Sequence, residues 1–140
     1  TLGWGYATGL GVKVARPNVP VLSINGDGGF MYNVQEMATA VRHGINLVAI
    51  VFNDGAFGNV KRTQKLRYGN RTIASDLTNP NFSKLAESFG VVGLRATSPQ
   101  ALQERLEEAF KMEAPVLIEA PVGEMPDPWS SVLKFSRVRG

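Results

Sequence analysis

Two short glycine-containing segments carry the side chains with the most informative chemistry. Gly26–Gly29 reads Gly-Asp-Gly-Gly, and Asn53–Gly55 reads Asn-Asp-Gly. Asp27 offers a carboxylate and Asn53, 26 residues later, an amide oxygen, and Mg²⁺ prefers oxygen ligands of this kind. The neighbouring glycines expose backbone N–H groups, which bind phosphate oxygens. These residues predict a magnesium ion that holds a phosphorylated ligand.

Each of the two segments follows an apolar run that predicts a buried strand. The runs are Val19–Ile24 and Leu47–Phe52, and both are rich in β-branched residues and are followed closely by glycine. In an open α/β sheet, ligands bind outside the carboxyl ends of the strands. We therefore expect Asp27 and Asn53 to meet in one crevice.

The rest of the chain alternates between helical and extended patterns. We expect a turn at Gly26–Gly29 and a long irregular stretch from Asn53 to about Leu77, with a helix possible only at Asn59–Arg67. The other expected helices are Tyr6–Ala15, Asn33 to about His43, Phe82–Phe89, and Ser98 to about Met112, and the other expected strands are Val91–Leu94 and Val116–Ala120. This alternation predicts an α/β fold, a three-layer αβα sandwich with a mostly parallel sheet covered on both faces.

The helix between the first two strands carries local signals for its start and its buried face. Asn33 is expected to be its N-cap, and Glu36, three residues later, completes a capping-box pattern. Its loop-side end would then favour an anion. The inward-facing residues expected from helical spacing are Val34, Met37, Ala38 and Val41.

Composition limits the classes of protein that fit. The chain has 140 residues, 44% of them hydrophobic, which suits one domain with a real core. It has no cysteine, so disulfides and cysteine nucleophiles are excluded, and no apolar run of about 18 residues, so no membrane helix is expected. We expect a cytoplasmic enzyme that binds no membrane.

The net charge of +3 is concentrated in one segment. Five basic residues lie within eleven positions: Lys61, Arg62, Lys65, Arg67 and Arg71. Nucleic-acid binding surfaces combine such clusters with aromatic side chains, and Tyr68 is the only aromatic residue here. We expect a solvated face or an anion-facing loop and no nucleic-acid partner.

The spaced pair of motifs resembles the thiamine diphosphate signature of the enzymes related to acetohydroxyacid synthase and pyruvate decarboxylase. The glycine-rich segment Gly3–Pro17 is similar to the helix that precedes the first strand in that family. The resemblance implies thiamine diphosphate and Mg²⁺ as cofactors, with Asp27, Asn53 and the backbone carbonyl of Gly55 as metal ligands. The residues that it places along the cofactor are Leu2, as an apolar support for the bent thiamine, and Gly26, Gly28, Gly29, Phe57 and Gly58 near the diphosphate.

The same resemblance implies the reaction and the assembly. Family members decarboxylate or carboligate 2-oxo acids, with the cofactor as electron sink, and form active sites between the subunits of a homodimer or homotetramer. Their activating glutamate comes from another domain, so we expect this segment alone to be inactive and to belong to a longer polypeptide. We expect residues 1–120 to bind the cofactor and residues 121–140 to form a tail that packs on them, with a lid around Trp129 as a minor alternative.

Several other readings remain open. Asp27 and Asn53 also suit simple turns. Gly3 and Gly5 suggest a dinucleotide fingerprint, but Thr8 stands where the third glycine belongs, and the motif precedes a strand instead of following one. A non-catalytic relative that binds a phosphorylated ligand and a nucleotide-binding oxidoreductase domain are the alternative functions. Asn59 matches neither the glutamate of pyruvate decarboxylases nor the apolar residue of acetohydroxyacid synthases, so the substrate stays open.

Overall fold

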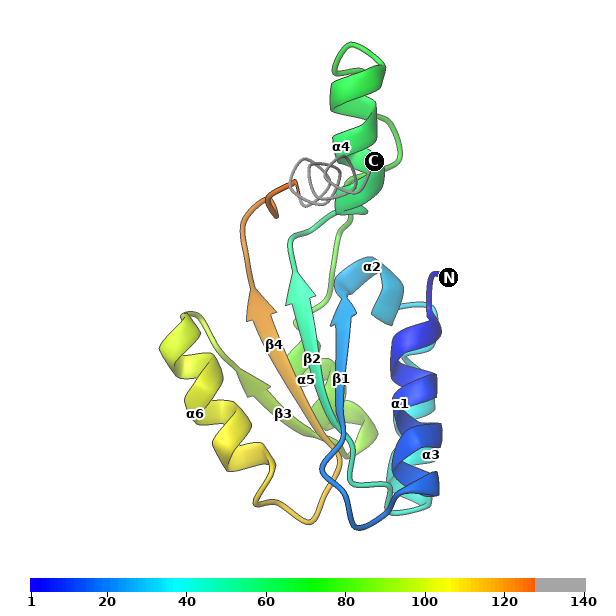
Figure 1. The fold of residues 1–140 in the computed structure, drawn as a ribbon, viewed down its shortest axis with the longest axis vertical. Helices are drawn as coiled ribbons and strands as arrows, with labels where there is room; N and C mark the ends of the chain where they lie inside the picture. Colours follow the sequence, from blue (N-terminus) through cyan, green and yellow to red (C-terminus); the bar gives the residue numbers. More distant parts are fainter. Residues whose placement is uncertain (128–140) are drawn as a thin grey trace, which may run out of the picture.

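The computed structural model describes residues 1–127 as a parallel sheet with helices packed on its faces (Figure 1). The sheet has four strands in the order β1-β2-β4-β3: β1 (Leu22–Gly26), β2 (Val48–Asn53), β3 (Val92–Arg95) and β4 (Val116–Pro121). The helices are α1 (Trp4–Ala15), α2 (Asp27–Phe30), α3 (Glu36–Arg42), α4 (Gly58–Arg67), α5 (Phe82–Phe89) and α6 (Pro99–Ala109). All three strand pairings are parallel, which confirms the predicted α/β class.

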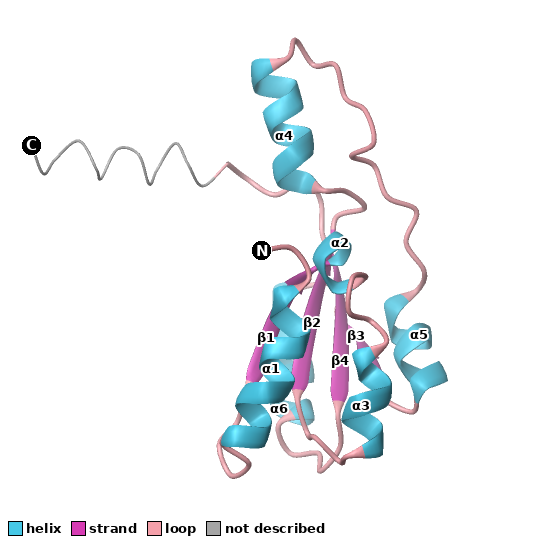
Figure 2. Cartoon of the chain, turned by 90° about the vertical axis from the view of Figure 1, so that its right-hand side faces the viewer, coloured by secondary structure: helices cyan, strands magenta, loops and turns pink. Residues whose placement is uncertain are grey.

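Two hydrophobic clusters, one on each face of the sheet, form the layers. On one face, α1, α3 and α5 cover the sheet, and Phe30 lies edge-on to Tyr6 and to Phe82 with ring centroids 5.3 and 5.8 Å apart. On the other face, α6 packs on β3 and β4, with Ala109 buried against them. Figure 1 separates these layers, with α6 on one side of the sheet and α1 and α3 on the other, and Figure 2 looks onto the sheet from the side of α1 and α3. Among the described residues no helix covers β1 on the α6 side, and Ile24 is 63% exposed there.

The first strand starts later than the apolar run predicts. Val19 and Pro20 stay outside β1, which begins at Leu22, where pairing with Val48 starts. Proline has no N–H for a ladder, and the amide of Val19 instead donates to the carbonyl of Arg16 at 3.1 Å in a turn. The prediction of Val19–Ile24 was therefore displaced toward the N-terminus, although the strand itself is confirmed.

The segment after β1 also differs from its prediction. The expected turn at Gly26–Gly29 is mostly the short helix α2, in which the amide of Met31 donates to the carbonyl of Asp27 at 3.1 Å. The predicted N-cap at Asn33 is wrong, because α3 begins at Glu36 and its N-cap is Gln35, without a side-chain bond. Asn33 donates its amide to the carbonyl of Gly3 at 2.5 Å, so a tertiary partner takes the group that a local cap would use.

The buried stripe of α3 is also partly misassigned. Met37 is fully buried as predicted, but Ala38 and Val41 are exposed and Ala40 is buried in their place. The N-cap of α3 is Gln35, two residues later than predicted, and the helix has 7 residues, of which Met37 and Ala40 are buried. Similarly, α6 ends at Ala109, and Phe110, which was expected to face inward, is 43% exposed.

Local signals were accurate elsewhere in the chain. Asn81 caps α5 by accepting from the amide of Lys84 at 2.9 Å, and Gly90 ends that helix with a φ of 84°. Ser98 caps α6, and Pro99 occupies its first turn. These residues confirm that helix ends with strong local signals can be placed from sequence.

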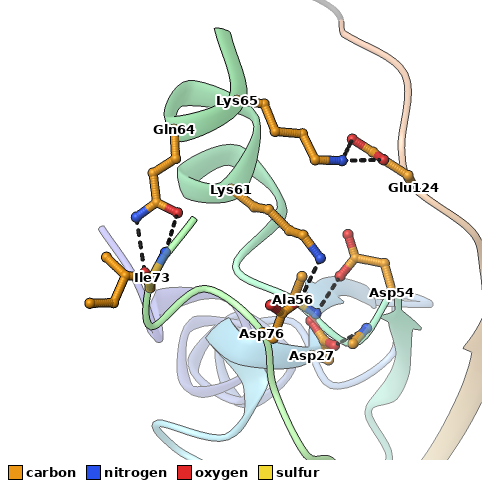
Figure 3. Close-up of polar contacts among 10 residues, drawn as sticks. Asp27, Asp54, Ala56, Lys61, Gln64, Lys65, Ile73, Asp76 and Glu124 are labelled. Carbon is orange, nitrogen blue, oxygen red and sulfur yellow. Dashed lines mark hydrogen bonds and ion pairs between the residues drawn. The ribbon is translucent and has the colours of Figure 1, made fainter. Parts of the chain in front are cut away.

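A long excursion carries α4 away from the sheet, beyond the carboxyl ends of the strands (Figure 1). An antiparallel bridge between Ala56 and Asp76 closes its base, and Phe57 donates its N–H to the carbonyl of Ser75 at 2.8 Å. At its tip, the amide of Gln64 donates to the carbonyl of Ile73 at 2.9 Å (Figure 3). The possible helix at Asn59–Arg67 is therefore confirmed.

The described part of the tail, after β4, contacts this excursion. The N–H of Val122 donates to the carbonyl of Asn53 at 2.9 Å, and the guanidinium of Arg62 donates to the carbonyls of Met125 and Pro126 at 2.7 and 3.1 Å. Packing of the whole tail 121–140 stays a prediction. The suggested lid around Trp129 lies outside the described residues.

The phenol of Tyr6 predicts how stability changes at alkaline pH. Burial, and secondarily the charge of Glu36, raise the pKa of Tyr6 above the usual value of about 10. The folded state therefore keeps a proton that the unfolded state loses, and stability should fall as pH rises above about 10. In urea unfolding at a series of pH values, Tyr6→Phe should lose stability less steeply there than the unchanged protein. Tyr68→Phe, at an exposed tyrosine, is the control and should retain the steep loss; equal slopes for all three proteins would contradict the prediction.

Candidate functional site

The two candidate ligands lie at the carboxyl ends of neighbouring strands. Asp27 directly follows β1, and Asn53 is the last residue of β2. Gly26 pairs with Phe52 in the parallel register, so the two side chains emerge at the same edge of the sheet. The structure thus brings together the residues that the sequence predicts to meet.

The oxygens of these two side chains face one point. The amide nitrogen Nδ2 of Asn79 donates to Asp27 Oδ2 at 2.6 Å and to Asn53 Oδ1 at 2.9 Å. Two acceptors that share one donor atom must converge on it, as the ligands of a cation do. A carboxylate and an amide oxygen arranged in this way fit Mg²⁺ chemically.

Protein side chains alone would not complete such a cation site. In the described part of the chain, no three His, Cys, Asp or Glu side chains gather around one point. Mg²⁺ is usually bound through one or two carboxylates together with waters and substrate phosphates. The donor set therefore fits a cation that also binds a phosphorylated ligand.

Backbone hydrogen bonds fix the carboxylate of Asp27. It is 2% exposed. Its Oδ1 accepts from the N–H of Gly28, and its Oδ2 accepts from the N–H of Gly55, both at 2.8 Å. A buried carboxylate needs such donors, because leaving it unpaired is costly. These bonds also tie the loop after β1 to the loop after β2.

The backbone of Gly55 contributes to this arrangement through its unusual conformation. Its φ of 68° is one that side-chain-bearing residues rarely adopt, so glycine suits the turn. Its carbonyl accepts from the N–H of Leu77 at 2.8 Å, which uses one of the two lone pairs of the oxygen. A cation would bind to the second lone pair. The role of the Gly55 carbonyl as a metal ligand stays a prediction.

Neighbouring side chains lie so close to the backbone of Gly28 and Gly58 that a Cβ atom would not fit at either position. A Cβ atom on Gly28 would lie 2.5 Å from the ring of Phe57, and one on Gly58 would lie 2.6 Å from Asp54 Oδ2. Leu2 reaches the same loop, since a Cβ on Gly29 would lie 3.6 Å from its Cδ1. The structure therefore gathers the predicted cofactor residues from three distant segments, together with Gly26 at the end of β1.

A cavity of about 320 Å³ opens beside this loop. Its wall is largely apolar, with Asn79 as the residue that links it to Asp27; the lining residues are Gly28, Met31, Tyr32, Phe57, Leu77, Thr78 and Asn79. A cavity of this size with a few polar groups suits a small ligand.

Burial, and secondarily the charge of Asp27, raise the pKa of the nearby Asp54 carboxyl.

The basic cluster on α4 binds other parts of the chain. Lys61 pairs with Asp76, and Lys65 donates to both carboxylate oxygens of Glu124 at 2.7 and 2.9 Å (Figure 3). Arg62 bonds to the tail, and Nε of Arg71 donates to the carbonyl of Tyr68 at 3.1 Å, so four of the five clustered basic residues have acceptors within the chain. These exposed contacts link the excursion to the described part of the tail, and the expectation of a solvated face or an anion-facing loop stays a prediction.

Sequence reasoning missed two residues of the site. Asn79 precedes the expected helix Phe82–Phe89 and was not singled out, but its side chain joins Asp27 to Asn53. Glu119 was absorbed into the apolar run of β4, and it accepts from Asn53 Nδ2 at 3.0 Å. The signal that could have identified Glu119 is that it is a single acidic residue inside an otherwise apolar strand. No comparable signal marked Asn79.

The described residues contain no helix long and apolar enough to cross a bilayer.

A search of solved structures finds a similar fold in the thiamine diphosphate-dependent 4-hydroxybenzoylformate decarboxylase of Rhodococcus jostii RHA1. The TM-score is 0.83, with 27% sequence identity over 90% of this chain and 24% of that one.

Sequence comparison finds relatives among larger proteins. The chain is 41% identical over 122 residues to an acetolactate synthase of Bacillus subtilis, covering 87% of this chain and 21% of that protein. It is 40% identical over 114 residues to an acetolactate synthase large subunit of Haemophilus influenzae, covering 81% and 20%. The chain thus spans about a fifth of the length of these relatives. The family model of the thiamine pyrophosphate enzyme C-terminal TPP-binding domain matches residues 1–120, and the chain belongs to this family.

Proposed function

We propose that this chain holds thiamine diphosphate through Mg²⁺ in an enzyme that decarboxylates or carboligates 2-oxo acids, as in acetolactate synthase. The observation that carries the proposal is the convergence of Asp27 Oδ2 and Asn53 Oδ1 on one point. The membership of the chain in a TPP-binding family supports the identity of the ligand.

Each part of the site has a role in this proposal. Asp27, Asn53 and the carbonyl of Gly55 hold the cation. The N–H groups of the glycine loop and of the start of α4 bind the diphosphate, from Gly28, Gly29, Phe57 and Gly58. Leu2, which lies beside Gly29, supports the thiamine. When bound, the cofactor supplies an electron sink for loss of CO₂ from a 2-oxo acid.

The chain holds the cofactor but does not complete the catalytic machinery. Glu36 is the acidic residue of the helix that follows the glycine loop, and it accepts from the hydroxyl of Thr39 at 2.8 Å in a local contact. We propose that the activating carboxylate comes from another part of the protein and that the site lies between subunits of a homodimer or homotetramer. Residues 1–140 alone should show no turnover.

Thermal unfolding of the intact protein tests the proposal. Thiamine diphosphate with Mg²⁺ should raise the melting temperature at a hundredfold excess over its dissociation constant, since a ligand then stabilises by about 2.7 kcal/mol. Removal of the metal with EDTA should cancel the rise, and NAD should cause none. A rise with NAD alone would favour the nucleotide-binding oxidoreductase instead.

A panel of 2-oxo acids separates the enzyme from a non-catalytic relative. The intact protein loaded with thiamine diphosphate and Mg²⁺ should release CO₂ from at least one member of the panel. Binding of the cofactor without turnover on any 2-oxo acid would contradict the proposed reaction and support a purely structural or regulatory ligand.

A further inference from the structure

A buried carboxylate in the middle of the sheet is not explained by the fold. Glu119 lies on β4, between β2 and β3, opposite Val51 and Arg95, and is 2% exposed. Its neighbours along the strand are apolar and buried. Burying an acidic side chain costs free energy unless hydrogen bonds or opposite charges compensate for it. Its presence therefore points to a role beyond packing.

The contacts of Glu119 are few and directed at the site. Its Oε1 accepts from Asn53 Nδ2 at 3.0 Å. Its Oε2 is buried and has no hydrogen-bond partner among residues 1–127. The one hydrogen bond that this carboxylate makes in the described structure is thus to a proposed metal ligand.

This bond, together with the bond from Asn79, decides which way the amide of Asn53 points. The oxygen and nitrogen of an asparagine amide are alike in shape, so packing alone hardly distinguishes the two orientations. An ionised carboxylate only accepts hydrogen bonds, so Glu119 requires the NH₂ group of Asn53 on its own side. The oxygen Oδ1 then faces the opposite side, where it shares a donor with Asp27 Oδ2.

We propose that Glu119 is a positioning residue that holds Asn53 with its oxygen toward the cation. The negative charge behind the amide also polarises it and makes Oδ1 a better ligand, as outer carboxylates do for metal-bound histidines. This inference rests on the proposed function, because it assumes that Asn53 binds the metal. It adds a residue that acts on the metal only through Asn53.

The first experiment measures cation binding in the intact protein with Mn²⁺ as the probe. The protein is titrated with Mn²⁺ in the presence of excess thiamine diphosphate, and the concentration of free Mn²⁺ is measured by electron paramagnetic resonance. Glu119→Gln, which is nearly isosteric and can turn an amide donor toward Asn53, should raise the Mn²⁺ dissociation constant roughly tenfold, the lower end for loss of an outer-sphere partner. Glu104→Gln, which removes the same charge from an exposed position on α6, should leave it unchanged.

The Asn53→Asp variant separates two possible effects of Glu119, orientation of the residue 53 side chain and attraction of the cation by charge. In Asn53→Asp both side-chain oxygens can bind a cation, so the orientation no longer matters. Adding Glu119→Gln to Asn53→Asp should therefore change the Mn²⁺ dissociation constant less than about threefold, although the same charge is lost. An equal loss in both backgrounds would mean that Glu119 acts by its charge alone, and the positioning role would be overturned.

The outcomes distinguish this inference from the proposed function. If the unchanged protein binds no Mn²⁺ with thiamine diphosphate, the proposed function fails and this inference falls with it. If the unchanged protein binds Mn²⁺ and Glu119→Gln binds it equally well, only the positioning role is wrong. Should Glu119→Gln fail to fold, Glu119→Met fills a similar volume without an acceptor and should weaken Mn²⁺ binding at least as much; unchanged binding would refute the inference.

Discussion

Asp27→Asn is expected to abolish the stabilisation of the intact protein by thiamine diphosphate and Mg²⁺. The substitution keeps the shape of the side chain but removes the negative charge of the proposed cation site. It also places an NH₂ group where Oδ1 or Oδ2 now accepts from Gly28, Gly55 and Asn79. The rise in melting temperature expected for the unchanged protein at a hundredfold excess of cofactor should fall to near zero.

The same variant should also be less stable without the cofactor. An amide in place of the carboxylate leaves at least one of these buried donors without an acceptor, which costs about 1–3 kcal/mol. Differential scanning fluorimetry with and without cofactor separates the two effects, because only the difference between the two melts reports on binding. Asp76→Asn, which removes an exposed carboxylate paired with Lys61, is the matched control and should retain the full rise. A normal rise in Asp27→Asn would refute the role assigned to Asp27.

Gly93→Ala is expected to cause the largest loss of stability of any substitution considered for the fold. Gly93 lies on β3 where α5 crosses it, and a Cβ atom there would lie 2.2 Å from the carbonyl oxygen and 2.8 Å from the carbonyl carbon of Ser83. Both atoms belong to the backbone of α5, so no side chain can turn aside. The helix would have to move away from the sheet, and we expect a cost of about 3 kcal/mol or more.

A second glycine gives a control of opposite sign. Gly11 lies in α1 with nothing within 4 Å of a built Cβ, so Gly11→Ala should stabilise by about 0.5–1 kcal/mol through helix propensity. Urea unfolding of both variants measures the difference. The prediction for Gly93 would be contradicted if Gly93→Ala unfolded at the same urea concentration as the unchanged protein. Because Asn79 lies just before α5, the displaced helix should also weaken cofactor binding.

Much of the fold was predictable because its signals are local. The runs at Leu47–Phe52 and Val116–Ala120 correspond to the two central strands, β2 and β4, which are largely buried on both faces and therefore carry apolar residues throughout except at Glu119. The helices expected at Phe82–Phe89 and from Ser98 start as predicted, because Asn81 and Ser98 cap them by accepting from residues only three positions away. Two of the errors, at Val19–Ile24 and Asn33, arose where partners distant in the sequence or the missing N–H of a proline decided the outcome.

The residues of the site likewise fall into those predicted from local signals and those that depend on tertiary contacts. The types and spacing of Asp27 and Asn53, each at the end of a strand, were sufficient to predict that they meet. The sequence by itself therefore determined the fold class and the main pair of candidate ligands, since strand patterns and their order along the chain are local properties. Only the tertiary structure decided that Asn79 joins this pair and that Glu119 orients Asn53, because those contacts span 26 to 66 residues. Such pairings depend on how the helices and strands pack, and no local pattern records them.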